Sequence, residues 1–203
     1  MAYFNRVSDQ VKIDKPGFTW TQKTSVEGIS SPSSAIEWLA GQALKFVPLD
    51  TQDMPPAAKG ANHDEFGVWG ETWGARLTPQ ATAKAALTDK GAAWELRVDL
   101  KPEKRGTLPY KCPEHDHGKV FKVYTHGQIF GAIEPYAWLG KLEEFAPSYH
   151  DSWAILTIDK ATDRLVRAEY VLTMDGYFKA KPAVFPALEA TATITQHDIY
   201  KIG

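Results

Sequence analysis

Eight residues near the middle of the chain, 94–101, alternate strictly between apolar and charged side chains. The apolar set is Trp94, Leu96, Val98 and Leu100, and the charged set is Glu95, Arg97, Asp99 and Lys101. Because successive side chains of a strand point to opposite faces, this segment predicts a strand with one buried and one wet face. Such strands are typical of antiparallel sheets, whereas parallel strands are covered on both faces.

Further strands are predicted on both sides of this segment. Residues 153–158 and 165–173 are rich in apolar and β-branched side chains and flank the polar turn 159–163, which is the pattern of a hairpin. Residues 66–77, 119–133 and 191–200 complete a set of about six strands, although three glycines weaken the prediction for 66–77.

Three helices are predicted between the strands. The first spans 35–46, where Ser34 and Glu37 have capping-box spacing and apolar residues recur at helical intervals. The second runs from Thr78, a candidate N-cap followed by Pro79, to about Thr88. The third opens at 134–135 and continues to about residue 145.

The strands cluster late in the chain and do not alternate regularly with helices. This order favours an α+β fold over a doubly wound one, with a mostly antiparallel, twisted sheet, barrel-like in one version, and about three helices. At 203 residues the chain is expected to form a single domain, 1–203.

The charge balance and the cysteine count narrow the functional classes. With 23 basic and 25 acidic residues, the net charge is −2, so nucleic acid is not an expected partner. No apolar stretch has the length of a membrane helix, the N-terminal residues lack the apolar core of a secretory signal, and a single cysteine excludes an intrachain disulfide framework. A soluble, cytoplasmic protein with no membrane partner is the expectation.

One cluster of side chains has the chemistry of a metal site. Cys112, His115 and His117 lie within six residues, and His126 follows on the polar face of the predicted strand 119–133. Thiolate and imidazole are ligands of zinc and related ions, and a His-x-His pair on extended backbone projects both rings to one side. No cofactor is the first expectation; the alternative is a divalent ion, zinc, manganese or iron. A solvated loop without function remains the competing interpretation.

Seven tryptophans give the chain an unusual aromatic load. Trp69 and Trp73 are four residues apart on the predicted strand 66–77, and Tyr124 lies near the metal cluster. These three residues are the candidates for a binding surface, because Trp and Tyr dominate contact hot spots. The alternative is that they fill the core.

The sequence leaves open whether this protein is an enzyme. It has no Gly-x-Ser-x-Gly elbow and no phosphate-binding loop. The first hypothesis is a non-enzymatic binding or assembly protein that presents an aromatic-rich surface to a protein partner or to its own copies. The alternative is a metal-dependent hydrolase or lyase centred on the Cys/His-x-His cluster.

Overall fold

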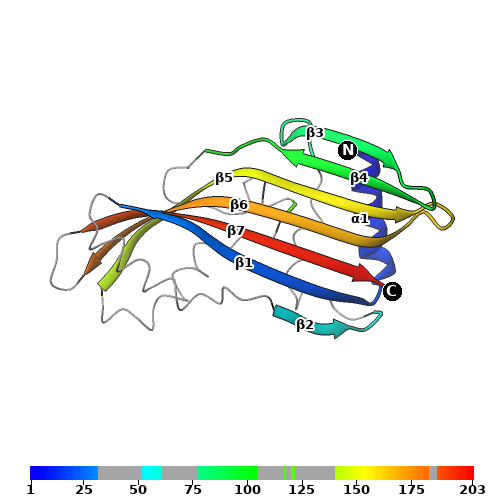
Figure 1. Ribbon diagram of the computed structural model, residues 1–203, viewed down its shortest axis with the longest axis horizontal. Helices are drawn as coiled ribbons and strands as arrows, with labels where there is room; N and C mark the ends of the chain where they lie inside the picture. Colours follow the sequence, from blue (N-terminus) through cyan, green and yellow to red (C-terminus); the bar gives the residue numbers. More distant parts are fainter. Residues whose placement is uncertain (32–51, 61–76, 105–116, 118–119, 122–139, 183–186) are drawn as a thin grey trace.

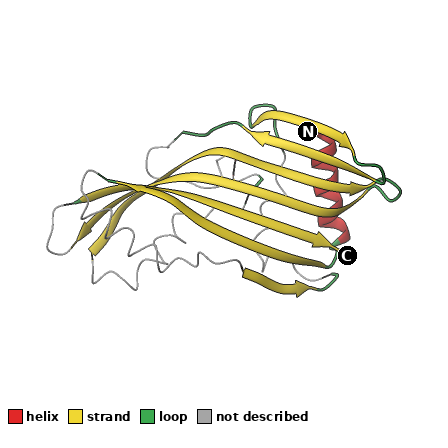
Figure 2. Ribbon diagram, viewed as in Figure 1, coloured by secondary structure: helices red, strands yellow, loops and turns green. Residues whose placement is uncertain are grey.

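The computed structural model describes residues 1–31, 52–60, 77–104, 117, 120–121, 140–182 and 187–203. These residues form one α-helix and seven β-strands (Figures 1 and 2). In chain order the elements are α1 (Ala2–Asp14), β1 (Phe18–Ser30), β2 (Gln52–Ala57), β3 (Thr82–Asp89), β4 (Ala93–Leu100), β5 (Gly140–Asp159), β6 (Arg164–Pro182) and β7 (Leu188–Ile202).

All seven strands belong to a single antiparallel sheet with the order β2-β1-β7-β6-β5-β4-β3. From β3 to β7, each strand pairs with the strand that follows it in the sequence. Strand β1, the first in the sequence, pairs with β7, the last (Figure 1). Among the described strands, β2 lies at one edge of the sheet and β3 at the other.

The prediction of an α+β fold with about three helices is wrong. The described residues form an antiparallel sheet with one helix, and that helix was not predicted. The expected helix 35–46 and the expected strand 66–77 lie outside the described residues, except for Leu77 at the end of the latter. The last part of the expected helix 134–145 is the beginning of β5, where Phe145 pairs with Phe178 of β6 and their rings lie 5.1 Å apart.

The helix expected at 78–88 illustrates why local signals failed. Thr78 does act as a cap: its hydroxyl accepts from the backbone N–H of Ala81 at 3.3 Å, and its carbonyl accepts from that of Thr82 at 3.1 Å. The helical turn that Thr78 caps is not continued, because the chain enters β3 at Thr82. Pairing with β4 outweighs the helix propensity of an alanine-rich segment that has no apolar stripe.

The alternating segment and the hairpin are confirmed. Strand β4 covers residues 93–100, and its side chains Leu96, Val98 and Leu100 are buried as the alternation predicts. Strands β5 and β6 meet at the turn 160–163, and the last strand is β7.

Helix α1 lies against one face of the sheet, which we call the inner face (Figure 1). Its buried side chains Phe4, Val7 and Val11 recur at helical spacing. Asn5 fixes the helix to Leu77 by two hydrogen bonds to the backbone, and Arg6 pairs with Asp163 in the β5–β6 turn. The described residues contain no helix with the length and apolarity needed to cross a bilayer.

The inner face forms the core beneath α1. Alternate residues of the central strands, among them Ala154, Leu156 and Ile158 of β5, are fully buried. Aromatic rings extend this core toward β1, where Trp20 stacks on Tyr200 at 5.5 Å. The opposite face, which we call the outer face, carries side chains of intermediate burial: Glu95, Arg97, Asp99, Trp153, Ile155, Thr157, Arg167, Glu169, Val171, His197 and Ile199.

Candidate functional site

Most of the residues predicted to carry function lie outside the described residues. His117 is the exception. The others are Trp69, Trp73, Cys112, His115, Tyr124 and His126.

The structure places His117 in the interior rather than in a solvated loop. Its side chain is almost completely buried and stacks with the rings of Phe121, at 5.9 Å, and Tyr149, at 4.9 Å. Glu103 lies beside it: one carboxylate oxygen accepts from the His117 backbone N–H at 3.0 Å and faces ring Nδ1 at 2.6 Å. The carboxylate therefore fixes the orientation of the ring.

The other ring nitrogen of His117, Nε2, is buried and has no hydrogen-bond partner in the described part of the chain. A buried polar atom without a partner costs about 1–3 kcal/mol, so such an atom suggests a functional role. However, the described residues contain no group of three or more His, Cys, Asp or Glu side chains arranged to hold a metal ion.

Strand β3 forms an edge of the sheet with no further strand paired to it among the described residues, and its hairpin with β4 shows which backbone groups face outward. The backbone N–H of Lys90 donates to the carbonyl of Ala93 at 2.9 Å, which makes 90 and 93 a hydrogen-bonded pair. Hydrogen-bonded and non-hydrogen-bonded pairs alternate along an antiparallel ladder. With the register Leu87↔Leu96 and Ala86↔Arg97, the N–H and C=O groups of 84, 86 and 88 point to β4. Those of Ala85, Leu87 and Asp89 point away from the sheet.

These outward groups are accessible. Every side chain from residue 83 to residue 89 is exposed, and within the described structure no element pairs with this edge (Figure 1). Alanine occupies three of the seven positions, and Leu87, which is 50% exposed, is one of the few large apolar side chains left open to solvent in the described chain. Edges of natural sheets are usually protected by prolines, bulges or several charges. The ladder of β3 with β4 is irregular between Thr82 and Lys84, but from Lys84 to Asp89 the register is regular, and residues 84–89 contain one lysine, one aspartate and no proline.

The opposite edge is protected. Strand β2 has the sequence QDMPPA, in which Pro55 and Pro56 lack backbone N–H groups. In an edge strand, one of any two adjacent residues directs its N–H away from the sheet. Because both Pro55 and Pro56 lack this group, at least one outward donor of β2 is missing. The ladder with β1 is also irregular here, between Phe18 and Trp20. In the described part of the chain, the β3 edge therefore keeps its outward donors at Ala85, Leu87 and Asp89, whereas the β2 edge lacks at least one.

The outer face is internally neutralised. Both carboxylate oxygens of Glu169 are engaged, one with His197 at 2.8 Å and the other with Arg167 at 2.6 Å. Trp153 lies between the Arg97 guanidinium, 4.7 Å from its ring centroid, and the His197 ring, at 6.2 Å. Because its neighbours already occupy these positions, Trp153 is not a free stacking platform for a ligand.

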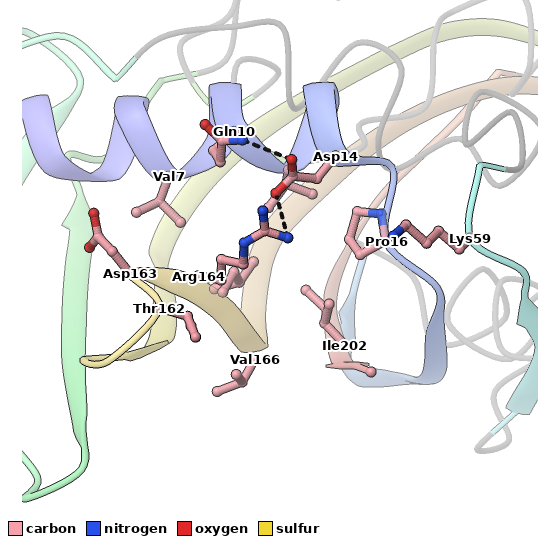
Figure 3. Close-up of a pocket in the computed structure, with 13 residues that line it drawn as sticks. Val7, Gln10, Asp14, Pro16, Lys59, Thr162, Asp163, Arg164, Val166 and Ile202 are labelled. Carbon is pink, nitrogen blue, oxygen red and sulfur yellow. Dashed lines mark hydrogen bonds and ion pairs between the residues drawn. The ribbon is translucent and has the colours of Figure 1, made fainter.

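A hollow of about 320 Å³ lies beside the C-terminal half of α1 (Figure 3). Apolar side chains from the helix and from β6 and β7 line it, including Val7, Val166 and Ile202. Asp14 and Arg164, which also line it, form an ion pair at 3.3 Å. Because these two charges pair with each other, neither is left to bind a charged ligand. We interpret the hollow as a packing gap between the helix and the sheet.

A buried carboxylate lies on the inner face near β1. Asp198 accepts hydrogen bonds from the Trp20 indole at 3.2 Å, from Gln22 at 3.0 Å and from Gln196 at 2.7 Å. Burial raises the pKa of Asp198, although the three donors and His197 act in the opposite direction. Burial likewise raises the pKa of the neighbouring phenols Tyr170 and Tyr200. This cluster is sealed in the core, which suits a structural role.

No protein-family model, curated protein or solved structure matched this chain. Sequence reasoning missed the free edge, because the alanine-rich segment resembles a helix. The Asp-Lys-Gly triplet at 89–91, just before the alternating strand, was the available hairpin signal.

Proposed function

We propose that this chain is a non-enzymatic assembly protein that accepts a partner strand on the free edge of β3. The observation that carries this proposal is the set of outward backbone groups at Ala85, Leu87 and Asp89, which lie on an exposed strand with mostly small side chains. Addition of a strand to an open sheet edge is a common mode of protein recognition, because the backbone supplies affinity and the alternate side chains supply specificity.

The neutralised outer face is consistent with this proposal. A charged partner such as nucleic acid would need unpaired cations, whereas Arg97 and Arg167 already engage neighbouring side chains. Backbone pairing at an edge does not depend on such charges.

The proposal can be tested by panning a displayed library of random peptides of about twelve residues against the chain, immobilised sparsely so that its copies cannot meet. We expect extended peptides to be enriched. Their binding should be lost in Ala85→Pro, which removes an outward N–H, and retained in Ala86→Thr, whose N–H points to β4. A panel that yields no binders, or binders indifferent to Ala85→Pro, would refute edge recognition.

The buried ring of His117 supports a second candidate, the metal-dependent enzyme. The Glu103 carboxylate holds Nδ1 of His117, and Nε2 has no hydrogen-bond partner among the described residues. Many metal-ligating histidines have this arrangement, in which the second nitrogen binds the ion. Cys112 and His115, the other expected ligands, lie outside the described residues. Metal analysis after exhaustive dialysis tests this candidate: one tightly held ion per chain, lost in a His115→Ala variant, would support it, and a metal-free parent would exclude it.

A further inference from the structure

We infer that the partner strand is β3 of a second copy of the same chain, so that two sheets join into a continuous sheet of fourteen strands about a twofold axis. This inference rests on the proposed function and names its partner. Two features of the sheet support it: the pairing that β3 allows with itself, and the difference between the two edges.

The backbone geometry of β3 fits antiparallel pairing with its own copy. Its outward groups all belong to odd-numbered residues, and the side chains of those residues share the inner face with Leu96 and Val98. If Ala85 lies opposite Leu87 of the second copy, every outward N–H and C=O of these two residues finds a partner. The symmetric contact places Ala86 at the twofold axis on the outer face.

The side chains also fit this register. Leu87 would cover Ala85 of the second copy, so the apolar inner stripe of β4 and β3 would continue across the junction. The small side chains at 83, 85 and 86 offer no steric obstacle. No two like charges face each other, because Lys84 would lie opposite Thr88 of the second copy. On the next strand Thr88 is paired with Glu95, a carboxylate within reach of the incoming lysine.

The blocked edge at β2 limits the assembly to two chains. If both edges could recognise a strand, the sheet would extend without end, as it does in fibrils. Since Pro55 and Pro56 remove donors from β2, the contact between two β3 strands uses the edge of each copy that, among the described strands, keeps its donors. A self-recognising edge is thus compatible with a closed dimer.

The first test is sedimentation of the purified chain from about 1 to about 100 µM, the range in which a strand-edge contact of this size is expected to associate. We expect a reversible shift from the 22.6 kDa monomer to a species of twice that mass. Leu87→Lys should weaken dimerisation at least about tenfold, because it places a charge next to the twofold axis, opposite Ala85 of the second copy. Ile13→Lys is the matched control: it changes an exposed apolar residue on α1 and should leave dimerisation unchanged.

The second test reports the register. In a Cys112→Ser background, Ala86→Cys should form a disulfide-linked dimer under mild oxidation, because the two Cα atoms of a symmetric non-hydrogen-bonded pair lie about 4.5 Å apart. Thr88→Cys should not, since Lys84 of the second copy lies opposite it.

The outcomes separate the two claims. A chain that stays monomeric at all these concentrations, or a dimer untouched by Leu87→Lys, overturns the self-pairing inference. Edge-dependent peptide binding by such a monomer would leave the proposed function standing, with another protein as the partner. Absence of both would refute both.

Discussion

Leu156 is a fully buried residue of β5 on the inner face. Its side chain has no exposed surface, and it pairs with Leu96 on one side and with Ala168 on the other. Leu156→Ala should lower the free energy of unfolding by about 2–5 kcal/mol, because it removes apolar contacts and leaves a cavity. Denaturant titration measures this loss. Ile13→Ala, at a position 74% exposed, is the control and should change the midpoint little; equal midpoints for the two variants would contradict the register of β5.

The buried carboxylate of Asp198 gives the chain a pH dependence of known sign. Burial raises the pKa of Asp198 in the folded state, so the folded state binds this proton more tightly than the unfolded state does. The stability contributed at this site is present at low pH and is lost as the pH rises from about 4, the ordinary value, through the folded pKa.

Asp198→Asn should therefore unfold at the same or a higher denaturant concentration than the parent at pH 7. The amide can still accept from Trp20 and Gln22, and Gln196 can rotate its own amide to match. The advantage of the variant should disappear below about pH 4, where the parent is also neutral. A variant less stable than the parent at pH 7 would show that the three donors outweigh burial.

At the scale of elements, the sequence predicted best where a strand alternates and pairs with its sequence neighbour. Strand β4 and the β5–β6 turn follow directly from period-two patterning and turn residues. The same local reasoning failed for α1, whose mean hydropathy is low and whose cap makes no side-chain hydrogen bond, and for β1, whose partner β7 lies at the other end of the chain. Long-range pairing leaves no mark in a window of a dozen residues.

For the site, the sequence identified His117 as a residue of interest but not its surroundings. The Glu103 carboxylate and the Tyr149 ring reach it from distant positions, joined by a bridge between Glu103 and Tyr149. Neither Glu103 nor Tyr149 lies in a sequence motif that would link it to His117, and only the fold brings the two residues to the imidazole. The free edge was hidden for a related reason: exposure of a strand is a property of the sheet order.

The alternation of backbone direction along β3 makes a prediction for that element. In dilute solution, where the edge is unpaired, the amide hydrogens of Ala85 and Leu87 should exchange rapidly, and those of Ala86 and Thr88 should be protected by β4. Hydrogen exchange followed by NMR measures this difference, and protection of all four amides would show that the edge is covered. At high concentration the first two should become protected as well, if copies pair.

At the scale of the whole molecule, the two edges differ in what they permit. Pro55→Thr with Pro56→Thr should restore a donor to the outward side of β2 and open the second edge. We expect the double variant to form species larger than a dimer, detected by light scattering. Combining it with Leu87→Lys should suppress these species, because a closed β3 edge leaves one contact per chain. A double variant that stays dimeric would show that the prolines are not what limits assembly.

The pairing of β1 with β7 also sets the order in which the sheet can be completed on the ribosome. Phe18 is synthesised long before its partner Ile202. At about 5–20 residues per second, β1 waits for about 10 to 30 seconds before β7 is synthesised. During that time the hairpins from β3 to β6 can form, while β1 has no strand of β7 to join. A nascent chain truncated before β7 would thus present an open edge at β6, and this makes the late stage of translation the period of greatest risk for association with the wrong neighbour.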